Sequence, residues 1–150
     1  MNVFLTGATG FIGGKLAAAL AARGHALTCG LRTARCAPPA CAQVRQVDFT
    51  RDFEPAAWQP LLEGTEILVN AVGMIRERPG RTFGDVHVRA PVAMFAAAQA
   101  VGVRRIFQIS ALGADAGARS TYHVSKRAAD DYLAGLPVDW VIVQPSLVTW

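Results

Sequence analysis

The first 14 residues, MNVFLTGATGFIGG, hold the pattern that decides the fold. An apolar run at 2–6 leads directly into a turn with glycines at positions 7, 10 and 13, and an alanine-rich stretch follows at 11–23. Gly7 permits a tight turn, Gly10 leaves room for a ligand beside the backbone, and Gly13 lets the next helix approach the strand closely. The stretch therefore predicts a strand, a turn and a helix whose N-terminus points its N–H groups at a dinucleotide pyrophosphate.

The rest of the chain repeats this alternation of short apolar runs and helical stretches. Further strands are predicted at 26–31, 43–47, 66–72, 105–109 and 139–143, and further helices at 55–62, 83–101 and 121–136. Strands that are apolar throughout and separated by helices form a parallel sheet that is covered on both faces, with right-handed crossovers. We therefore predict one α/β domain over 1–150, a doubly wound parallel sheet of the Rossmann type with helices on both faces.

The end of the chain is unusual for a domain. It stops at PSLVTW, directly after the last predicted strand, in mostly apolar residues. Domain ends usually lie in polar, flexible segments. We therefore expect a chain truncated after the sixth strand, and we expect the exposed last strand and the apolar 148–150 to favour self-association into a homo-oligomer.

Composition excludes several classes of protein. With 52% hydrophobic and 17% charged residues over 150 positions, the chain can bury a core and is not disordered. Its apolar stretches are shorter than the ~18 residues of a membrane-spanning helix, and the N-terminus has no basic and apolar leader. The net charge is +4, but the basic residues form no run or stripe. We expect a cytoplasmic protein that binds no nucleic acid and carries no membrane segment.

The three cysteines are Cys29, Cys36 and Cys41, an odd number in a chain without a secretory leader. Such a chain is expected to keep its thiols reduced. Cys36 and Cys41 flank a Pro-Pro pair and are therefore predicted to lie in a loop. No histidine stands beside them to complete a zinc site, so we expect no bound metal.

The residues after the second and third strands bear on the choice of dinucleotide. A site for NAD usually has an acidic residue at the end of the second strand, where it bonds the ribose 2′-hydroxyl. Arg32 stands there, and a guanidinium matches a 2′-phosphate. This favours NADP(H) over NAD(H); the alternative is that Arg32 stacks on the adenine of NAD. Asp48 and Phe49 would suit the adenine edge, unless Asp48 only caps a turn.

Three residues in the second half are candidates for catalysis. Tyr122 and Lys126 are four apart in the predicted helix and therefore share one face. The lysine, with a positively charged nicotinamide ring, would favour the phenolate and bring the tyrosine into working range as an acid or base. Ser110, at the carboxyl end of the fifth strand, would donate a hydrogen bond to a substrate carbonyl. A Tyr-x-x-x-Lys pair is common by chance, and only its place after the glycine turn and the serine makes it informative.

Five motifs together resemble the short-chain dehydrogenase/reductase superfamily: TGATGFIG at 6–13, NAVG at 70–73, ISALGA at 109–114, YHVSK at 122–126 and QPSLV at 144–148. The chain is most similar to the extended or atypical branch, the NAD-dependent epimerases/dehydratases, and to bacterial relatives of the nucleotide-binding accessory subunit of respiratory complex I. The resemblance covers essentially all 150 residues. It implies an NAD(P)(H)-binding domain of an oxidoreductase, in which the cofactor transfers hydride. The alternative that it implies is a non-catalytic nucleotide-binding module, structural or redox-sensing.

The resemblance also implies roles for single residues. Tyr122 becomes the general acid/base and Lys126 its partner and a ligand of the nicotinamide ribose. His87 stands where many relatives carry an asparagine of a proton relay, so it either relays a proton or is structural. Ala111 follows Ser110 where many relatives have a second hydroxyl, which weakens the serine assignment. The residues expected to contact the cofactor are Gly7, Thr9, Gly10, Phe11, Ile12, Gly13, Arg32, Asp48, Phe49, Ala71, Gly73, Lys126, Pro145, Ser146 and Leu147.

The resemblance sets one further expectation. The family builds its substrate pocket from a C-terminal part that is absent here, so we expect the 150 residues alone to turn over little or no substrate. The full-length protein is expected to be an NAD(P)-dependent oxidoreductase or epimerase, acting on a small molecule that the sequence does not name.

Overall fold

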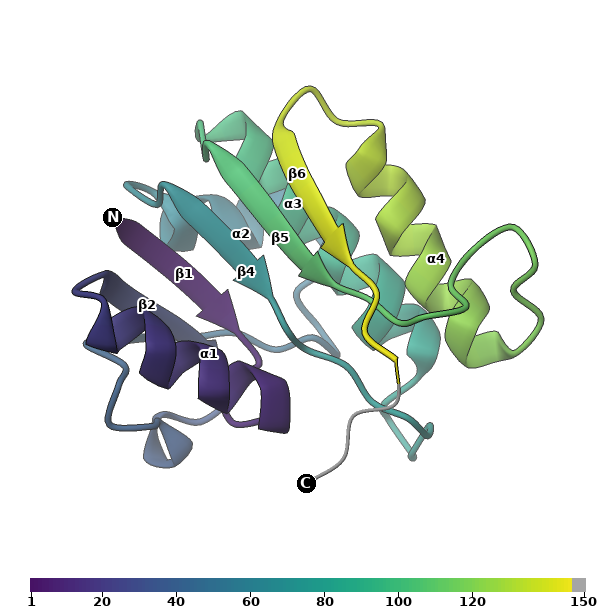
Figure 1. The fold of residues 1–150 in the computed structure, drawn as a ribbon, viewed down its shortest axis with the longest axis horizontal. Coiled ribbons are helices and arrows are strands. Elements are labelled where there is room, and N and C mark those ends of the chain that lie inside the picture. The colour runs from purple at the N-terminus through teal and green to yellow at the C-terminus, as the bar shows by residue number, and fades with distance from the viewer. Residues whose placement is uncertain (147–150) are drawn as a thin grey trace.

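The computed structural model describes residues 1–146, which form a six-stranded parallel sheet flanked by helices (Figure 1). The strands are β1 (Asn2–Thr6), β2 (Ala26–Leu31), β3 (Gln43–Gln46), β4 (Ile67–Asn70), β5 (Arg105–Ile109) and β6 (Asp139–Val143). The α-helices are α1 (Phe11–Ala22), α2 (Pro55–Leu62), α3 (Ala90–Ala100) and α4 (Thr121–Ala134). Across the sheet the order is β3-β2-β1-β4-β5-β6, and all neighbours are parallel. The predicted doubly wound, Rossmann-type sheet is confirmed.

The strand order reverses at β1. This strand pairs with β2 on one side, where Leu5 lies opposite Cys29, and with β4 on the other, where Leu5 lies opposite Val69. The chain winds outward from β1 in both directions, so the loops that follow β1 and β4 diverge. In such sheets, ligands bind in the crevice beyond the carboxyl ends of the strands at this switch point.

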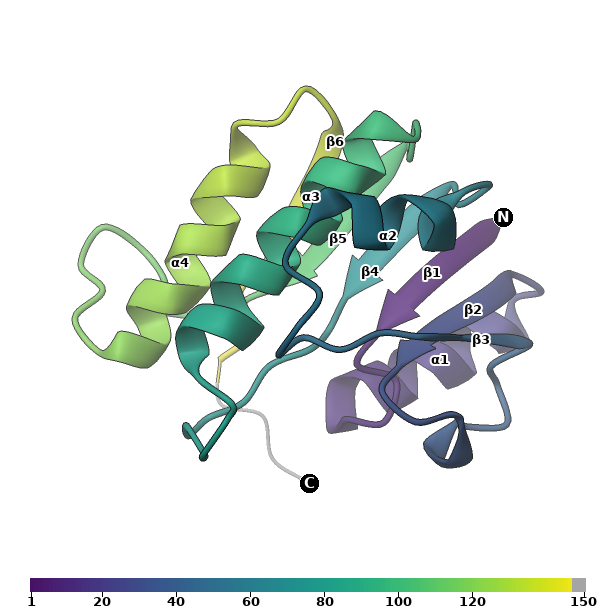
Figure 2. The ribbon, with the colours of Figure 1, turned by 180° about the vertical axis from the view of Figure 1, so that it is seen from behind.

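Side chains alternate between the two faces of β1 and so divide the core into two parts. Val3 and Leu5 pack toward α1 with Ala17, whereas Phe4 packs with Phe95 and Leu133 on the other face. Figure 1 shows α1 lying over β1 and β2, and Figure 2 shows α2, α3 and α4 covering the opposite face. Helices therefore lie on both faces, as predicted, although the coverage is unequal.

Two boundaries differ from the sequence-based prediction in an informative way. The predicted helix at 83–101 is divided into a π-helical segment, Gly84–Arg89, and α3. Pro91 explains the division, because proline has no N–H to donate to the carbonyl of His87 and its ring crowds that carbonyl. The strand predicted at 66–72 is shorter and ends at Asn70. The residues after Asn70 are therefore free to form a loop.

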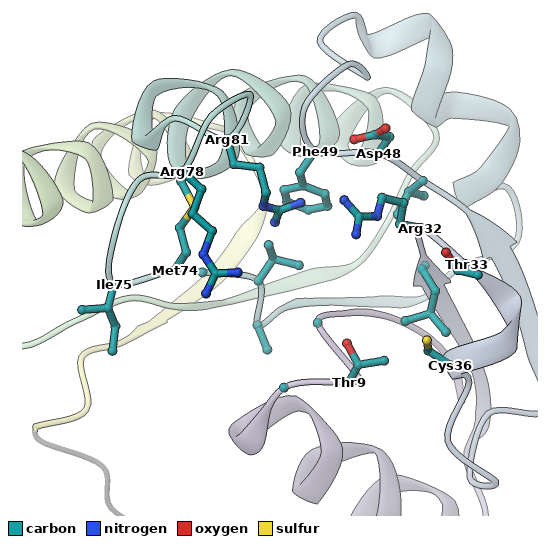
Figure 3. Close-up of a pocket in the computed structure, with 18 of the residues that line it drawn as sticks. Thr9, Arg32, Thr33, Cys36, Asp48, Phe49, Met74, Ile75, Arg78 and Arg81 are labelled. Atoms are coloured by element: carbon teal, nitrogen blue, oxygen red, sulfur yellow. The ribbon is translucent and has the colours of Figure 1, made fainter.

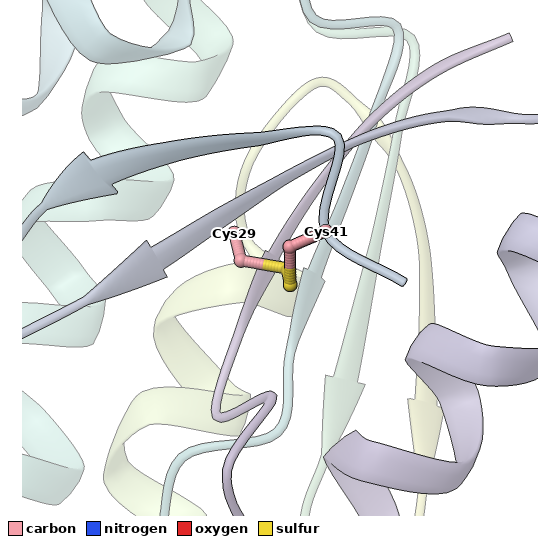
Figure 4. Close-up of a disulfide and its surroundings, with 2 residues drawn as sticks. All are labelled: Cys29 and Cys41. Carbon is pink, nitrogen blue, oxygen red and sulfur yellow. A yellow bond between two sulfur atoms is a disulfide. The ribbon is translucent and has the colours of Figure 1, made fainter. Parts of the chain in front are cut away.

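The expectation of three reduced thiols is wrong for two of them. Cys29 and Cys41 form a disulfide, with 5.8 Å between their Cα atoms (Figure 4). The pairing of β2 with β3 is the cause: the Ala42 N–H donates to the Leu27 carbonyl, which brings Cys41 back beside β2. Cys36 is a free, exposed cysteine in the loop that this disulfide closes.

Among residues 1–146, no helix is both long and apolar enough to cross a membrane.

Candidate functional site

The glycine turn is held together by contacts that leave no room for side chains at two of its positions. Gly7 has φ +86°, and a Cβ there would lie 2.5 Å from the carbonyl carbon of Ala71. A Cβ at Gly13 would lie 1.8 Å from the Gly7 carbonyl oxygen. These two glycines are therefore required by the packing of β1, β4 and α1, as expected for a turn that joins strand and helix closely.

Gly10 differs from its neighbours in the turn. A Cβ at this position would meet no atom of the protein nearer than the Gly7 carbonyl oxygen, at 3.4 Å. Folding alone therefore does not demand glycine here. Gly10 lines the cavity beyond the strand ends and is the N-cap of α1, whose first turn contains no acidic residue. The position fits a pyrophosphate that approaches the backbone at a helix N-terminus.

A cavity of about 900 Å³ opens beyond the carboxyl ends of β1, β2 and β4 (Figure 3). Its volume is in the range of ligand sites for molecules of nucleotide size. It lies at the switch point of the sheet, where a dinucleotide is expected. The predicted cofactor residues that line it are Gly7, Thr9, Gly10, Arg32, Asp48, Phe49, Ala71 and Gly73. Phe11, Ile12 and Gly13 form the first turn of α1 and do not line the cavity.

Asp48 lies in the cavity wall and also caps a turn. Its Oδ1 accepts hydrogen bonds from the Thr50 N–H (2.8 Å) and the Thr50 hydroxyl (2.6 Å). Burial raises the pKa of this carboxyl, but the bonds from Thr50 and the charges of Arg51 and Arg32 outweigh that effect and lower the pKa. Asp48 is thus negatively charged at neutral pH. It both caps a turn and lines the cavity, so the two interpretations are compatible.

Gly73 connects the cavity with the tyrosine and lysine. It lines the cavity, and a Cβ there would lie 3.7 Å from His87 Nε2 and 3.8 Å from Lys126 Nζ. Lys126 is only 3% exposed, and its ammonium donates to the Ile109 carbonyl at 3.0 Å. Burial lowers the pKa of Lys126 to about 8, against the opposing effect of the Asp130 charge.

Tyr122 is half-buried among aromatic rings. It packs edge-to-face against Phe83 and His87, with ring centroids 5.9 and 5.5 Å away. Burial raises the pKa of its phenol above the ordinary value of 10. The chain by itself thus does not produce the lowered pKa expected from Lys126. That lowering remains a prediction for the complex with the oxidised, positively charged nicotinamide.

Ser110 makes a different hydrogen bond from the one predicted. It is buried at the carboxyl end of β5, as expected, but its hydroxyl donates to Asp130 Oδ2. Within this structure the proton of Ser110 is therefore directed at α4 and not at the crevice. Ser110 as donor to a substrate carbonyl remains a prediction that would require this bond to change.

Asp130 was not predicted, although it follows Lys126 by four residues and so shares its helix face. It is 5% exposed, and its Oδ1 is buried without a hydrogen-bond partner among residues 1–146. Burial raises the pKa of its carboxyl, against the bond from Ser110 and the charge of Lys126. Asp130 therefore completes a buried polar group with Ser110 and Lys126 behind the tyrosine.

His87 uses both ring nitrogens inside the protein. The Met74 N–H donates to Nε2 at 3.1 Å, so the proton is on Nδ1, which bonds to Ser125 Oγ at 2.9 Å. Ser125 in turn donates to the Tyr122 carbonyl at 2.7 Å. Burial and the charge of Lys126 lower the pKa of His87 to about 3. These bonds favour the structural alternative, in which His87 holds the loop after β4 against α4.

Two of the remaining predicted contacts, Pro145 and Ser146, do not line the cavity. The Leu112 N–H donates to the Pro145 carbonyl at 3.0 Å, which places Pro145 beside the segment that follows Ser110. Pro145 is half-buried and Ser146 is exposed. Leu147 lies outside the described residues. None of the acidic, histidine and cysteine side chains within 1–146 gather into a group of three that could hold a metal.

Comparison with known proteins agrees with this geometry. The NAD(P)H-binding family is matched over residues 7–149. The chain is 31% identical over 156 aligned positions to the ceramide reductase of Caulobacter vibrioides, which covers 97% of this chain and 46% of that protein. It thus spans about half the length of this relative.

Solved structures have the same fold. The oxidoreductase YlbE of Lactococcus lactis gives a TM-score of 0.80 at 25% identity, over 97% of this chain and 68% of that one. WbmH of Bordetella bronchiseptica, solved in complex with NAD⁺, gives a TM-score of 0.77 at 18% identity, over 95% and 55% of the two chains. The resemblance to short-chain dehydrogenases/reductases of the epimerase/dehydratase type is confirmed. With its glycine turn, switch-point cavity and Rossmann sheet, the chain belongs to the NAD(P)H-binding family, as a dinucleotide-binding domain.

Proposed function

We propose that this domain prefers NADP(H) to NAD(H) and that the protein it belongs to reduces a carbonyl group at the Tyr122 side of the cavity. One observation carries the proposal: Gly73 lines the same cavity as Arg32, and a Cβ on Gly73 would lie only 3.8 Å from the buried ammonium of Lys126. A single crevice could then bind both the adenosine end and the nicotinamide end of one dinucleotide.

Each residue has a definite task in this proposal. A bound nicotinamide supplies hydride transfer. Tyr122 keeps its proton at neutral pH because burial raises the pKa of the phenol, and a protonated phenol is the form that can donate to a carbonyl oxygen during reduction. Lys126 is held by its bond to the Ile109 carbonyl close to Gly73, where it can bond a ribose hydroxyl. Gly10 and the first turn of α1 bind the pyrophosphate.

The reductive direction is supported by the relative that is 31% identical, whose name describes reduction of ceramide. A carbonyl compound of the lipid class is therefore the first substrate to assay with NADPH. Catalysis, the substrate and homo-oligomerisation are proposed for the whole protein.

The cofactor preference is tested by titrating the chain with NADPH and NADH. We expect NADPH to bind more tightly by about 1.5–3 kcal/mol, as for hydrogen bonds to charged groups, and Arg32→Ala to remove most of this difference. Arg23→Ala is the matched control, because Arg23 caps the far end of α1 and does not line the cavity. Equal affinities in the unmutated chain would overturn the preference.

A further inference from the structure

The loop after β4 forms a small hairpin at residues 78–81. The Arg78 N–H donates to the Arg81 carbonyl at 3.1 Å, and the Arg81 N–H donates to the Arg78 carbonyl at 2.8 Å. Pro79 and Gly80 form the turn, with Gly80 at φ +76°. Proline restricts φ and glycine tolerates the positive φ, so both residues suit a tight connection. The hairpin backbone thus fixes where its two arginines leave the chain.

The base of the hairpin is anchored to the protein. Glu77 Oε1 accepts a hydrogen bond from the Phe83 N–H at 3.0 Å. Phe83 is 8% exposed, and its ring stacks on His87 with 5.2 Å between centroids. The acidic residue next to the hairpin is therefore bonded at its base, and it forms no ion pair with either arginine among residues 1–146.

The cavity wall is rich in unpaired cations. Four arginines line it: Arg32, Arg76, Arg78 and Arg81. None of the four forms an ion pair within residues 1–146, whereas four arginines outside the cavity, Arg89, Arg104, Arg105 and Arg127, do so. Asp48 is the only acidic residue among the described cavity-lining residues. The cavity therefore has an excess of positive charge that a bound anion would balance.

Two of these arginines converge. Arg81 comes from the hairpin and Arg32 from the end of β2, and Figure 3 shows their guanidinium groups pointing toward one another near the ring of Phe49. Arg81 is half-buried, so part of its hydration is already removed. Two like charges that face each other repel, whereas an anion between them is attracted by both. A phosphate monoester suits this arrangement, because each planar guanidinium can bind it through two N–H groups.

We propose that Arg81 is a specificity-determining residue that binds the 2′-phosphate of NADP(H) together with Arg32, from the opposite wall of the cavity. The inference rests on the proposed preference for NADP(H). The pyrophosphate is a less suitable occupant, because its place is at Gly10 and α1, on the side of the cavity where Figure 3 shows Thr9. Arg81 instead lies toward Arg32 and Phe49, the residues that follow β2 and β3.

The experiment compares two adenosine ligands that differ in one phosphate, 2′,5′-ADP and 5′-AMP, by calorimetric titration of the chain. We expect Arg81→Gln to weaken 2′,5′-ADP about tenfold or more and 5′-AMP by less than about twofold. Arg81→Lys keeps the charge but loses the planar fork, so we expect an intermediate loss. Arg23→Gln is the control, because Arg23 does not line the cavity and both affinities should stay unchanged, and circular dichroism verifies that each variant is folded.

A double variant sharpens the result. If Arg32 and Arg81 bind one phosphate, the loss in Arg32→Gln/Arg81→Gln should differ from the product of the two single losses. The inference is overturned if Arg81→Gln leaves 2′,5′-ADP binding unchanged, or if it weakens both ligands equally, as an arginine that stacks on adenine would. If Arg32→Gln removes the preference for 2′,5′-ADP whereas Arg81→Gln retains it in full, the proposed function stands and the role of Arg81 falls. If the unmutated chain binds both ligands equally, both proposals fall.

Discussion

The nucleotide cavity and the Tyr122–Lys126 region meet at one edge of the sheet, but they are built in opposite ways. The cavity is made of glycine backbone and of arginines without ion pairs among the described residues. The Tyr122–Lys126 region is made of titratable side chains that are buried or half-buried and held by contacts within the protein. Lys126 and Asp130 are 3% and 5% exposed, and Ser110 donates to Asp130.

This difference predicts which substitutions should affect ligand binding and which should affect folding. A solvated arginine without an ion pair contributes little to the free energy of unfolding, so its substitution is expected to weaken ligand binding. A buried, paired charge is part of the fold, because removing one partner leaves the other charged and unsatisfied.

The largest effect is expected in the glycine turn. Gly10→Val should abolish nucleotide binding, by about 1,000-fold or more, because the branched side chain fills the space of the pyrophosphate. The variant should still fold, since a Cβ at Gly10 meets nothing nearer than 3.4 Å. NADPH titration and thermal unfolding measure the two properties separately.

Two glycines in the same helix turn serve as controls. Gly14→Ala should keep nucleotide binding, because a Cβ there is 3.4 Å from the Ala8 carbonyl oxygen and Gly14 does not line the cavity. Gly13→Ala should instead fail to fold, because its Cβ would lie 1.8 Å from the Gly7 carbonyl oxygen. A folded Gly10→Val protein that binds NADPH normally would place the phosphates elsewhere.

The second effect concerns the buried acid. Asp130→Ala should lower the free energy of unfolding by about 3 kcal/mol, because it leaves the buried Ser110 hydroxyl without its acceptor and removes the negative charge that favours the charged form of the buried Lys126. Asp131→Ala is the adjacent control, in which a largely exposed ion pair with Arg127 (3.2 Å) is lost at a cost of less than about 0.5 kcal/mol. Urea unfolding measures both. Equal losses in the two variants would contradict the contrast.

The third effect concerns the disulfide beside the cavity. Cys41→Ala should lower the free energy of unfolding by about 3 kcal/mol, the loop-closure value for a separation of 12 residues. Cys36→Ala should leave stability unchanged, because Cys36 is exposed and free. Peptide mapping without reductant should show Cys29 linked to Cys41. Mapping that finds three free thiols would restore the expectation drawn from the sequence.

The last effect is a pH dependence from His87. Its pKa in the folded protein is lowered to about 3, so the unfolded chain, with the ordinary value of 6.5, binds more protons between these two values. The contribution of neutral His87 is therefore complete above about pH 6.5 and is lost as the pH falls toward 3, by up to about 1.4 kcal/mol per pH unit.

Substitution at His87 should flatten this slope. The free energy of unfolding of His87→Gln, followed from pH 7 to pH 4, should fall less steeply than that of the unmutated chain, whatever its absolute value. His25→Gln is the control, because the His25 side chain is half-buried and its only hydrogen bond among residues 1–146 is with the N-terminal amine. An unchanged slope in His87→Gln would show that the buried ring is not the source of acid sensitivity.

Much of the nucleotide half could be predicted because its signals are local. Gly7, Gly10 and Gly13 act within one turn, and Arg32 follows its strand directly, so neighbouring residues carry the information. The hairpin at 78–81 was missed, although Pro79-Gly80 is a typical turn pair. The hairpin matters because its Arg81 side chain points toward Arg32. That orientation depends on the bond between Glu77 and the Phe83 N–H, which anchors the loop.

The other half depends on residues that are distant in the sequence. Ser110 and Asp130 are separated by 20 positions, and His87 and Ser125 by 38. The spacing of Tyr122 and Lys126 predicts that they share one helix face. It does not predict their ionisation, because burial raises the pKa of Tyr122 and lowers the pKa of Lys126.

The alternation of strands and helices and the glycine turn could be predicted from local sequence, and with them a doubly wound dinucleotide-binding sheet. These follow from hydrophobic periodicity and from backbone freedom, which are properties of adjacent residues. Only the tertiary structure decided that Cys29 joins Cys41, that Ser110 bonds Asp130 and that Arg32 faces Arg81. The physical reason is that strand register and packing bring these groups together across the sheet. Hydrogen bonds, charges and desolvation act over a few ångströms of space, whatever the distance along the chain.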